Sequence, residues 1–255
     1  NRGFLIITEP ELAYEIADAD LVGVTGTNGK TTTTTLISLM LNHLKNKNKA
    51  YACGNIGISA VETAKKATVD DILVMELSSF QLLGITKLHP KIAVLTNIYE
   101  AHTDYHGSRE NYVKAKMRLL KNQTEADHFV VNFDQAEWRE LSQQAKAKVV
   151  PFSRTAFTKE GAYEENGILY FKDEAIMPAD EIKVPGTHNI ENALAAIAVA
   201  KLMGVATADI VEVLQTFSGV KHRTQYVTTF NERKFYNDSK ATNIEATEKA
   251  LAGFK

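Results

Sequence analysis

The sequence predicts an α/β fold, in which a P-loop-type, mostly parallel sheet is flanked by helices. Short apolar runs alternate with segments of helical periodicity over residues 20–153, the pattern of a parallel sheet with helical crossovers. A glycine-rich turn, GTNGK at 26–30, joins one apolar run to one helical segment. An Asn-Gly pair at 166–167 lies between two aromatic-rich arms and predicts a small β-hairpin element.

The individual elements follow from this alternation. Short apolar runs predict strands at 21–25, 50–53, 71–77, 91–97, 128–132 and 148–152. Helical periodicity predicts helices at 30–45, 109–122, 134–146, 189–203 and 207–217. The predicted hairpin covers 162–176, and a further strand, polar turn and helix follow at 226–254.

The organisation of the chain favours one central domain. Residues 20–221 are enough to bury a core. Residues 1–19 are too few to form a domain, and 222–255 hold one strand-and-helix unit that cannot bury its own face. We therefore expect parts of two further domains on either side of the central one.

Composition narrows the class of protein. The 255 residues include 29 Lys plus Arg and 31 Asp plus Glu, a formal net charge of -2, which argues against a broad surface for nucleic acid. The single cysteine, Cys53, cannot form an internal disulfide and favours a reducing compartment. Since apolar runs fall short of the ~20 residues that span a bilayer, we expect a soluble, cytoplasmic protein that binds no membrane.

The turn at 26–30 has the chemistry of a phosphate-binding loop. Backbone N–H groups of such a turn and the start of the following helix favour anions, a lysine can reach phosphate oxygens, and the next hydroxyl can hold Mg²⁺. The common pattern G-x-x-x-x-G-K-[ST] would need glycine at 24, where Val24 stands. The alternative is a plain turn with an exposed lysine. Phosphate binding is predicted for Gly26, Thr27, Asn28, Gly29, Lys30, Thr31 and Thr32.

Two further stretches place polar groups at strand ends. Glu76 ends an otherwise apolar strand and begins the stretch ELSSFQL, and α/β sheets bind ligands at the carboxyl ends of their strands. An exposed strand end is an equally good interpretation from the pattern alone. GNIG at 54–57, which contains Asn55, also follows a strand and could close over phosphates or form a simple turn.

Lys116 stands out within the helix predicted at 109–122. At about 100° per residue, the apolar side chains of this helix form one broad arc, and Lys116 falls in its middle. Its stem could carry the ammonium out to solvent. A buried ammonium would instead have a lowered pKa, and an uncharged lysine can add CO₂.

Seven stretches together resemble the Mur ligase family and, more distantly, folylpolyglutamate synthases. They are GTNGKT, ELSSFQL, NIYEAHTDYHG, YVKAKMR, PGTHNIENALAA, KHRTQ and YNDSKATN, in this order along the chain. The resemblance implies a ligase that uses ATP to join an amino acid to a carboxylate through an acyl phosphate. ELSSFQL is most similar to the members that add D-glutamate to UDP-N-acetylmuramoyl-L-alanine in peptidoglycan synthesis.

The resemblance also implies roles for individual residues. It assigns one Mg²⁺ to Thr31 and Glu76, and a second to His102 and a carbamate formed from CO₂ on Lys116. It assigns phosphate contacts to Lys30 and Arg223, adenine contacts to Asn189 and Asn192, and ribose to Asp238. Asparagine amides suit adenine, although capping of a helix by Asn189 is an alternative. Contacts with the other substrates are implied for Asn55, Ser78, Lys240 and Thr242, and catalytic roles for Lys30, Lys116, His102, Arg223 and Lys240.

The implied domains match the division drawn from length. Residues 1–19 would end an N-terminal UDP-binding domain or linker, 20–221 would bind ATP, and 222–255 would begin a Rossmann-like C-terminal domain for the amino acid. We expect small-molecule substrates only and a monomer. This chain alone is expected to be inactive. The alternatives are another Mur or folylpolyglutamate-type ligase, and an ATP-binding module without turnover.

Overall fold

The computed structural model describes residues 6–155, 157–221, 225–241 and 244–252. In this part of the chain one large sheet has nine strands in the order β2-β3-β1-β4-β5-β6-β7-β8-β9. The strands are β1 (Asp20–Thr25), β2 (Ala50–Gly54), β3 (Ile72–Glu76), β4 (Ile92–Leu95), β5 (His128–Asn132), β6 (Lys148–Ser153), β7 (Ala162–Glu165), β8 (Ile168–Phe171) and β9 (Glu174–Pro178).

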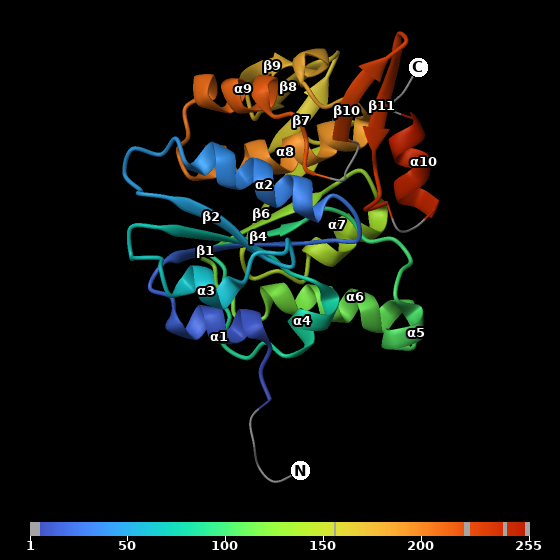
Figure 1. The fold of residues 1–255 in the computed structure, drawn as a ribbon. Helices are drawn as coiled ribbons and strands as arrows, with labels where there is room; N and C mark the ends of the chain where they lie inside the picture. Colours follow the sequence, from blue (N-terminus) through green and yellow to red (C-terminus); the bar gives the residue numbers. More distant parts are fainter. Residues whose placement is uncertain (1–5, 156, 222–224, 242–243, 253–255) are drawn as a thin grey trace.

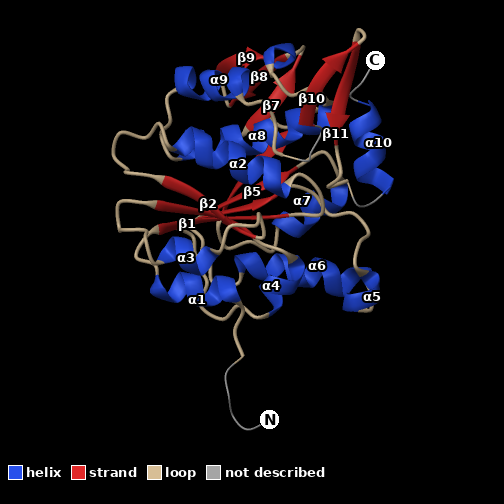
Figure 2. Ribbon diagram, in the orientation of Figure 1, coloured by secondary structure: helices blue, strands red, loops and turns tan. Residues whose placement is uncertain are grey.

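Helices cover both faces of this sheet (Figures 1 and 2). One layer holds α2 (Lys30–Leu41), α8 (Thr187–Leu202) and α9 (Thr207–Thr216). The opposite layer holds α1 (Glu9–Ile16), α3 (Ala60–Ala64), α4 (Ser79–Leu83), α5 (Thr103–His106), α6 (Arg109–Met117) and α7 (Ala136–Ser142). Two antiparallel strands, β10 (Gln225–Phe230) and β11 (Arg233–Asn237), and α10 (Ile244–Ala252) stand apart from the main sheet.

The parallel part of the sheet creates the switch point that ligands favour. Strand β1 pairs in parallel with β3 on one side and with β4 on the other. From β1 the chain crosses to β2, beyond β3, whereas from the neighbouring β4 it crosses to β5 in the opposite direction. The carboxyl end of β1 at Thr25 therefore opens a crevice between neighbouring loops. The predicted α/β class is confirmed, and the glycine-rich turn lies at this crevice.

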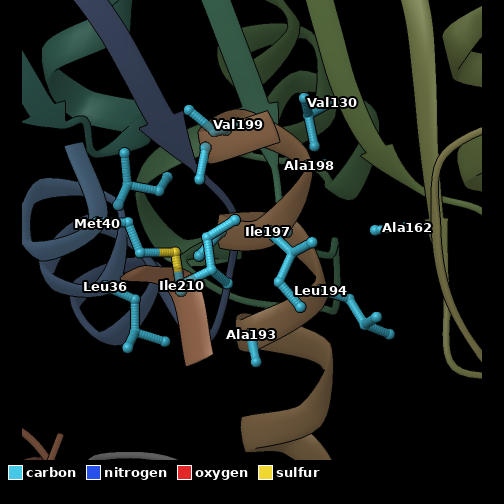
Figure 3. Packing of buried hydrophobic residues seen from close by; sticks show 14 of the residues in the cluster. Leu36, Met40, Val130, Ala162, Ala193, Leu194, Ile197, Ala198, Val199 and Ile210 are labelled. Atoms are coloured by element: carbon cyan, nitrogen blue, oxygen red, sulfur yellow. The ribbon is translucent and has the colours of Figure 1, made fainter. Parts of the chain in front are cut away.

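Two apolar cores lie on either side of the sheet. The first packs α2, α8 and α9 onto one face, with the alanine-rich α8 at its centre (Figure 3). Every side chain of α8 from Ala193 to Ala200 is fully buried, because small residues let this helix approach both the sheet and α2. The second core lies under α1, α3, α4, α6 and α7 and includes Tyr112, Phe129 and Trp138.

Several element boundaries differ from the sequence predictions. The helix predicted at 30–45 ends at Leu41, the one at 109–122 gives way to a 3₁₀ turn after Met117, and the one at 134–146 covers only 136–142. Helices α1, α3, α4 and α5 were not predicted, because segments of four to eight residues show little periodicity. The predicted hairpin is a three-strand extension of the main sheet.

Candidate active site

The loop from Gly26 to Lys30 is shaped by two glycines. Gly29 has a left-handed backbone, with φ 81°, and a Cβ there would lie 2.2 Å from Asn192 Oδ1. A Cβ on Gly26 would lie 1.9 Å from the hydroxyl of Thr96. Both positions therefore exclude larger residues. The loop passes into α2 with its backbone close to neighbouring elements, as a phosphate cradle requires.

Asn97, which the sequence analysis did not select, fixes the middle of this loop. Its side-chain Oδ1 accepts from the Asn28 N–H at 2.8 Å, and its Nδ2 donates to the Asn28 carbonyl at 3.1 Å. Its own carbonyl accepts from the N–H of Thr27 at 2.9 Å. The available signal was its position at the end of the strand predicted at 91–97, because the parallel strand β4 in this segment ends at the same sheet edge as β1.

Lys30 lies over the loop that precedes it. Its Nζ donates to the carbonyls of Gly26 at 3.0 Å and Thr27 at 2.9 Å. An ammonium held at the mouth of a glycine-rich loop can neutralise phosphate oxygens there. The predicted position of Lys30 beside the phosphate cradle thus agrees with the geometry.

Thr31, Glu76 and Asn55 form a hydrogen-bonded chain beside the loop. The Thr31 hydroxyl donates to Glu76 Oε2 at 2.9 Å, and Asn55 Nδ2 donates to Glu76 Oε1 at 2.9 Å. Glu76 is buried at the end of β3, next to β1. A hydroxyl and a carboxylate beside a phosphate loop are the oxygen ligands that Mg²⁺ prefers. These residues fit a Mg²⁺ site.

Lys116 is 2% exposed and reaches the underside of the same loop from α6. Its Nζ donates to the Gly26 carbonyl at 2.6 Å and lies 3.5 Å from the Thr25 hydroxyl. Burial, together with the nearby charge of Lys30, holds the pKa of Lys116 well below its usual value. The site therefore favours an uncharged amine, which is the form that reacts with CO₂.

His102 is held at the edge of the site in an uncommon backbone conformation. Its φ is 55° and ψ 31°, a left-handed geometry that is unusual for a residue other than glycine. Its ring lies edge-on to Phe80, with centroids 5.0 Å apart, and 6.1 Å from the ring of Tyr112. Tyr112 also contacts Lys116, so the two predicted ligands of a second metal flank one aromatic ring.

His106 has a packing role in the structure. Its ring is buried, stacks on Phe80 and forms a hydrogen bond through Nε2 with the hydroxyl of Ser79 at 3.0 Å. Burial lowers the pKa of His106, and the neighbouring His102 and Lys116 lower it further. A neutral ring at this position supports the loop that carries His102.

A pocket lies beside the loop, between the start of α8 and the segment after β11. Its lining includes Asn28, Gly29, Asn189, Asn192 and Asp238, together with Thr32, Asn97, Val184, His188, Glu191, Gly219, Val220, Ala241 and Ala250. Three of the residues predicted to bind phosphate, Asn28, Gly29 and Thr32, thus share one pocket with the residues predicted to bind adenine and ribose.

Of the two asparagines of α8, Asn192 lies against the loop and Asn189 bonds to the segment before the helix. Asn192 Oδ1 accepts from the Thr33 hydroxyl at 3.3 Å and would meet any side chain at Gly29. Asn189 Nδ2 donates to the Pro185 carbonyl at 2.7 Å, while the residue that caps the helix is Gly186. Asn189 is therefore not the N-cap.

The structure does not place all of the remaining predicted residues at the loop or in the pocket. Ser78 forms a capping box with Gln81 at the start of α4. Lys240 is exposed, outside the set of residues that line the pocket. Arg223 and Thr242 lie outside the described residues. Within the described residues, none of the helices is both long and apolar enough to span a membrane.

The fold and the site together define an α/β protein of the P-loop type, with a phosphate-type loop at the carboxyl end of β1. A family model described as the Mur ligase middle domain matches residues 24–200. The chain therefore belongs to the Mur ligase family, whose members depend on ATP and Mg²⁺.

Individual relatives agree with this assignment. The chain is 70% identical over 254 residues to the UDP-N-acetylmuramoylalanine–D-glutamate ligase of Ligilactobacillus salivarius. The matched segment covers 100% of this chain and 56% of that protein. It is 65% identical over 254 residues to the ligase of the same name from Lactiplantibacillus plantarum, again over 100% of this chain and 55% of that protein. The chain thus spans about half the length of these relatives.

Solved structures show the same fold. MurF from Acinetobacter baumannii matches with a TM-score of 0.74 at 20% identity, over 95% of this chain and 55% of that chain. MurF from Thermotoga maritima, in complex with ADP, matches with a TM-score of 0.71 at 22% identity, over 96% of this chain and 60% of that chain. The predicted membership of the Mur ligase family is confirmed.

Proposed function

We propose that this chain forms the ATP-binding part of an ADP-forming ligase that joins D-glutamate to UDP-N-acetylmuramoyl-L-alanine in peptidoglycan synthesis. One observation carries the proposal: Lys30, Lys116 and the Thr31–Glu76 pair converge on a single phosphate-type loop. A protein that only held a nucleotide would have no use for the second, buried lysine. The names of the relatives, at 65–70% identity over the whole chain, supply the substrates.

The proposed reaction has two steps. The terminal carboxylate of UDP-N-acetylmuramoyl-L-alanine attacks the γ-phosphorus of ATP, which forms an acyl phosphate and releases ADP. The amine of D-glutamate then attacks the acyl carbon, so that an amide forms, phosphate leaves, and the amine gives up a proton. Transfer between anions chiefly demands alignment and neutralised charge. Lys30 at the loop mouth serves that need.

Metal ions would neutralise further charge on the phosphates and the carboxylate. Thr31 and Glu76 fit the first Mg²⁺, as their hydrogen bond already joins the two oxygen donors. His102 and a carbamate on Lys116 are the proposed ligands of a second Mg²⁺. The low pKa of Lys116 supports the carbamate, since only the neutral amine adds CO₂.

The other site assignments complete the proposal. Asn189, Asn192 and Asp238 line the pocket where adenine and ribose would lie. Arg223, Lys240 and Thr242 remain predicted contacts for phosphate and substrates, as does Ser78. Residues 1–19 and 222–255 would belong to flanking domains for UDP and the amino acid, with 20–221 as the ATP-binding domain. We expect a cytoplasmic monomer, and no turnover by these 255 residues alone.

The test is ADP release by a full-length protein that carries this chain. UDP-N-acetylmuramoyl-L-alanine is supplied with D-glutamate, L-glutamate or L-lysine in turn. Turnover with D-glutamate alone is the expected result. Turnover with another amino acid would identify a different ligase of the family, and ATP binding without any turnover would leave only a nucleotide-binding protein.

A further inference from the structure

We propose that Tyr112 is a positioning residue, which holds the phosphate loop through Thr27 and supplies the surface against which Lys116 lies. The inference rests on the proposed function only in so far as the loop binds the phosphates of a nucleotide. It concerns a residue that packs beneath the loop, on the side of the sheet opposite α2.

The hydroxyl of Tyr112 contacts the loop directly. Its oxygen lies 3.0 Å from the Thr27 hydroxyl, and the Tyr112 side chain is 1% exposed. A buried hydroxyl of this kind costs free energy unless it has a partner, and here the partner is a loop residue.

Thr27 in turn forms hydrogen bonds with Tyr99 and Lys30. Its hydroxyl accepts from the Tyr99 N–H at 2.9 Å, and its carbonyl accepts from Lys30 Nζ at 2.9 Å. Tyr112 therefore holds a residue that in turn fixes the lysine at the loop mouth. Loss of the phenol hydroxyl removes one of the contacts that set the direction of Thr27.

The ring of Tyr112 faces the other half of the site. Lys116 Nζ lies 4.7 Å from the ring centroid, a cation–π distance for the ammonium and a packing contact for the neutral amine. The rings of His106 and His102 lie at 5.4 and 6.1 Å. The side chain of Tyr112 thus lies between the loop, Lys116 and His102 and contacts all three. It reaches Lys116 because the two residues are one turn apart on the same face of α6.

The decisive variant is Tyr112→Phe, which keeps the ring and removes the hydroxyl. In the full-length protein, the Kd for ADP with Mg²⁺, measured by calorimetry, should rise about three- to tenfold, as loss of one buried hydrogen bond predicts. Tyr163→Phe is the matched control. Tyr163 is also buried, but lies in β7 and stacks on Tyr170 away from the loop. An unchanged Kd in Tyr112→Phe, or an equal rise in Tyr163→Phe, would overturn the proposal.

A double-mutant cycle separates positioning from general destabilisation. Thr27→Val removes the partner hydroxyl, so adding Tyr112→Phe to it should change the Kd for ADP less than twofold, roughly the limit of additivity error. Fully multiplicative effects would show that the two hydroxyls act independently and would contradict the inference.

Turnover gives a second readout. Tyr112→Phe should raise the KM for ATP with little change in kcat, whereas Tyr112→Leu, which also removes the ring beside Lys116, should lower kcat as well. Equal effects of both variants on kcat would refute the role of the ring. Since the ADP titration needs no ligation, a wild-type protein that binds ADP without turnover would disprove the proposed function and leave the hydroxyl inference testable.

Discussion

Glu11 and Lys116 are both buried ionisable side chains, but their surroundings differ. Glu11, in α1, accepts hydrogen bonds from the Thr86 hydroxyl and the Lys87 N–H at 2.5 Å each and from the Leu88 N–H at 3.1 Å. Lys116, in α6, has a backbone carbonyl at 2.6 Å and a hydroxyl at 3.5 Å, with Lys30 nearby.

The pKa shifts show what this difference means. Burial alone would raise the pKa of Glu11, but its hydrogen bonds lower it overall, so the carboxylate stays charged. Burial lowers the pKa of Lys116 and Lys30 lowers it further, so the amine is favoured. A buried carboxylate with enough hydrogen-bond donors keeps its charge and links two elements, whereas burial beside another cation shifts a lysine towards its neutral, reactive form.

The largest effect is expected for Lys116→Met. Ligase activity should fall by about a hundred- to a thousandfold, as when a group that stabilises developing charge is removed. The free energy of unfolding at pH 7 should stay equal or rise by about 1 kcal/mol, since a methionine needs no hydrogen bonds. ADP release and chemical denaturation measure the two quantities. Lys114→Met, on the exposed face of the same helix, is the control and should leave both nearly unchanged.

Glu11→Gln should show the opposite pattern. The amide cannot accept from all three donors, so the free energy of unfolding should fall by about 2 kcal/mol, the range for hydrogen bonds to a charged group. Ligase kcat should change little. Urea denaturation tests this, with Glu15→Gln as the control, because Glu15 forms only a half-exposed ion pair with Lys87. A loss of ligase activity without a loss of stability would contradict the structural role assigned to Glu11.

Acidification should remove the contribution of Glu11. Because hydrogen bonds hold the folded-state pKa of Glu11 below the ordinary glutamate value of about 4.5, the stabilisation is complete above that value and is lost as the pH falls through the folded pKa. The stability difference between wild type and Glu11→Gln should therefore be full near neutral pH and shrink as the pH falls below about 4.5. Denaturation at a series of pH values measures it. A difference that stays constant would show that the carboxylate is not the stabilising form.

The smallest effect is expected for Ser78→Ala. The role of Ser78 is intermediate between the structural role of Glu11 and the proposed chemical role of Lys116. Ser78 caps α4 and follows Glu76 by two residues, so it has both a structural role and a predicted substrate contact. Loss of the cap should cost about 1 kcal/mol. Ser59→Ala removes the equivalent cap of α3 and is the control. A raised KM for UDP-N-acetylmuramoyl-L-alanine in Ser78→Ala alone would support the substrate contact, and equal KM values would leave Ser78 a cap.

Sequence reasoning found the residues whose local pattern was unusual. Lys116 interrupted an apolar arc, and the structure confirms that it is buried. Glu76 ended an apolar strand, and it is hydrogen-bonded to Thr31. Glu11 and the hydroxyl of Tyr112 had no such signal, because their partners are far away in the sequence. Asn97 had only its place at the end of a predicted strand. Short helices such as α3 and α4 were not predicted, because a single helical turn carries little periodicity.

The sequence by itself determined the α/β class, the phosphate-type loop and the family, because periodicity and short motifs are local properties of the chain. Only the tertiary structure decided which side chains hold that loop. Asn97 reaches it from the segment after β4 and Tyr112 from α6, at distances that depend on the pairing of β1 with its neighbours. The tertiary structure also decided the direction in which the pKa of each buried ionisable group shifts, since a pKa depends on burial and on every group packed around it.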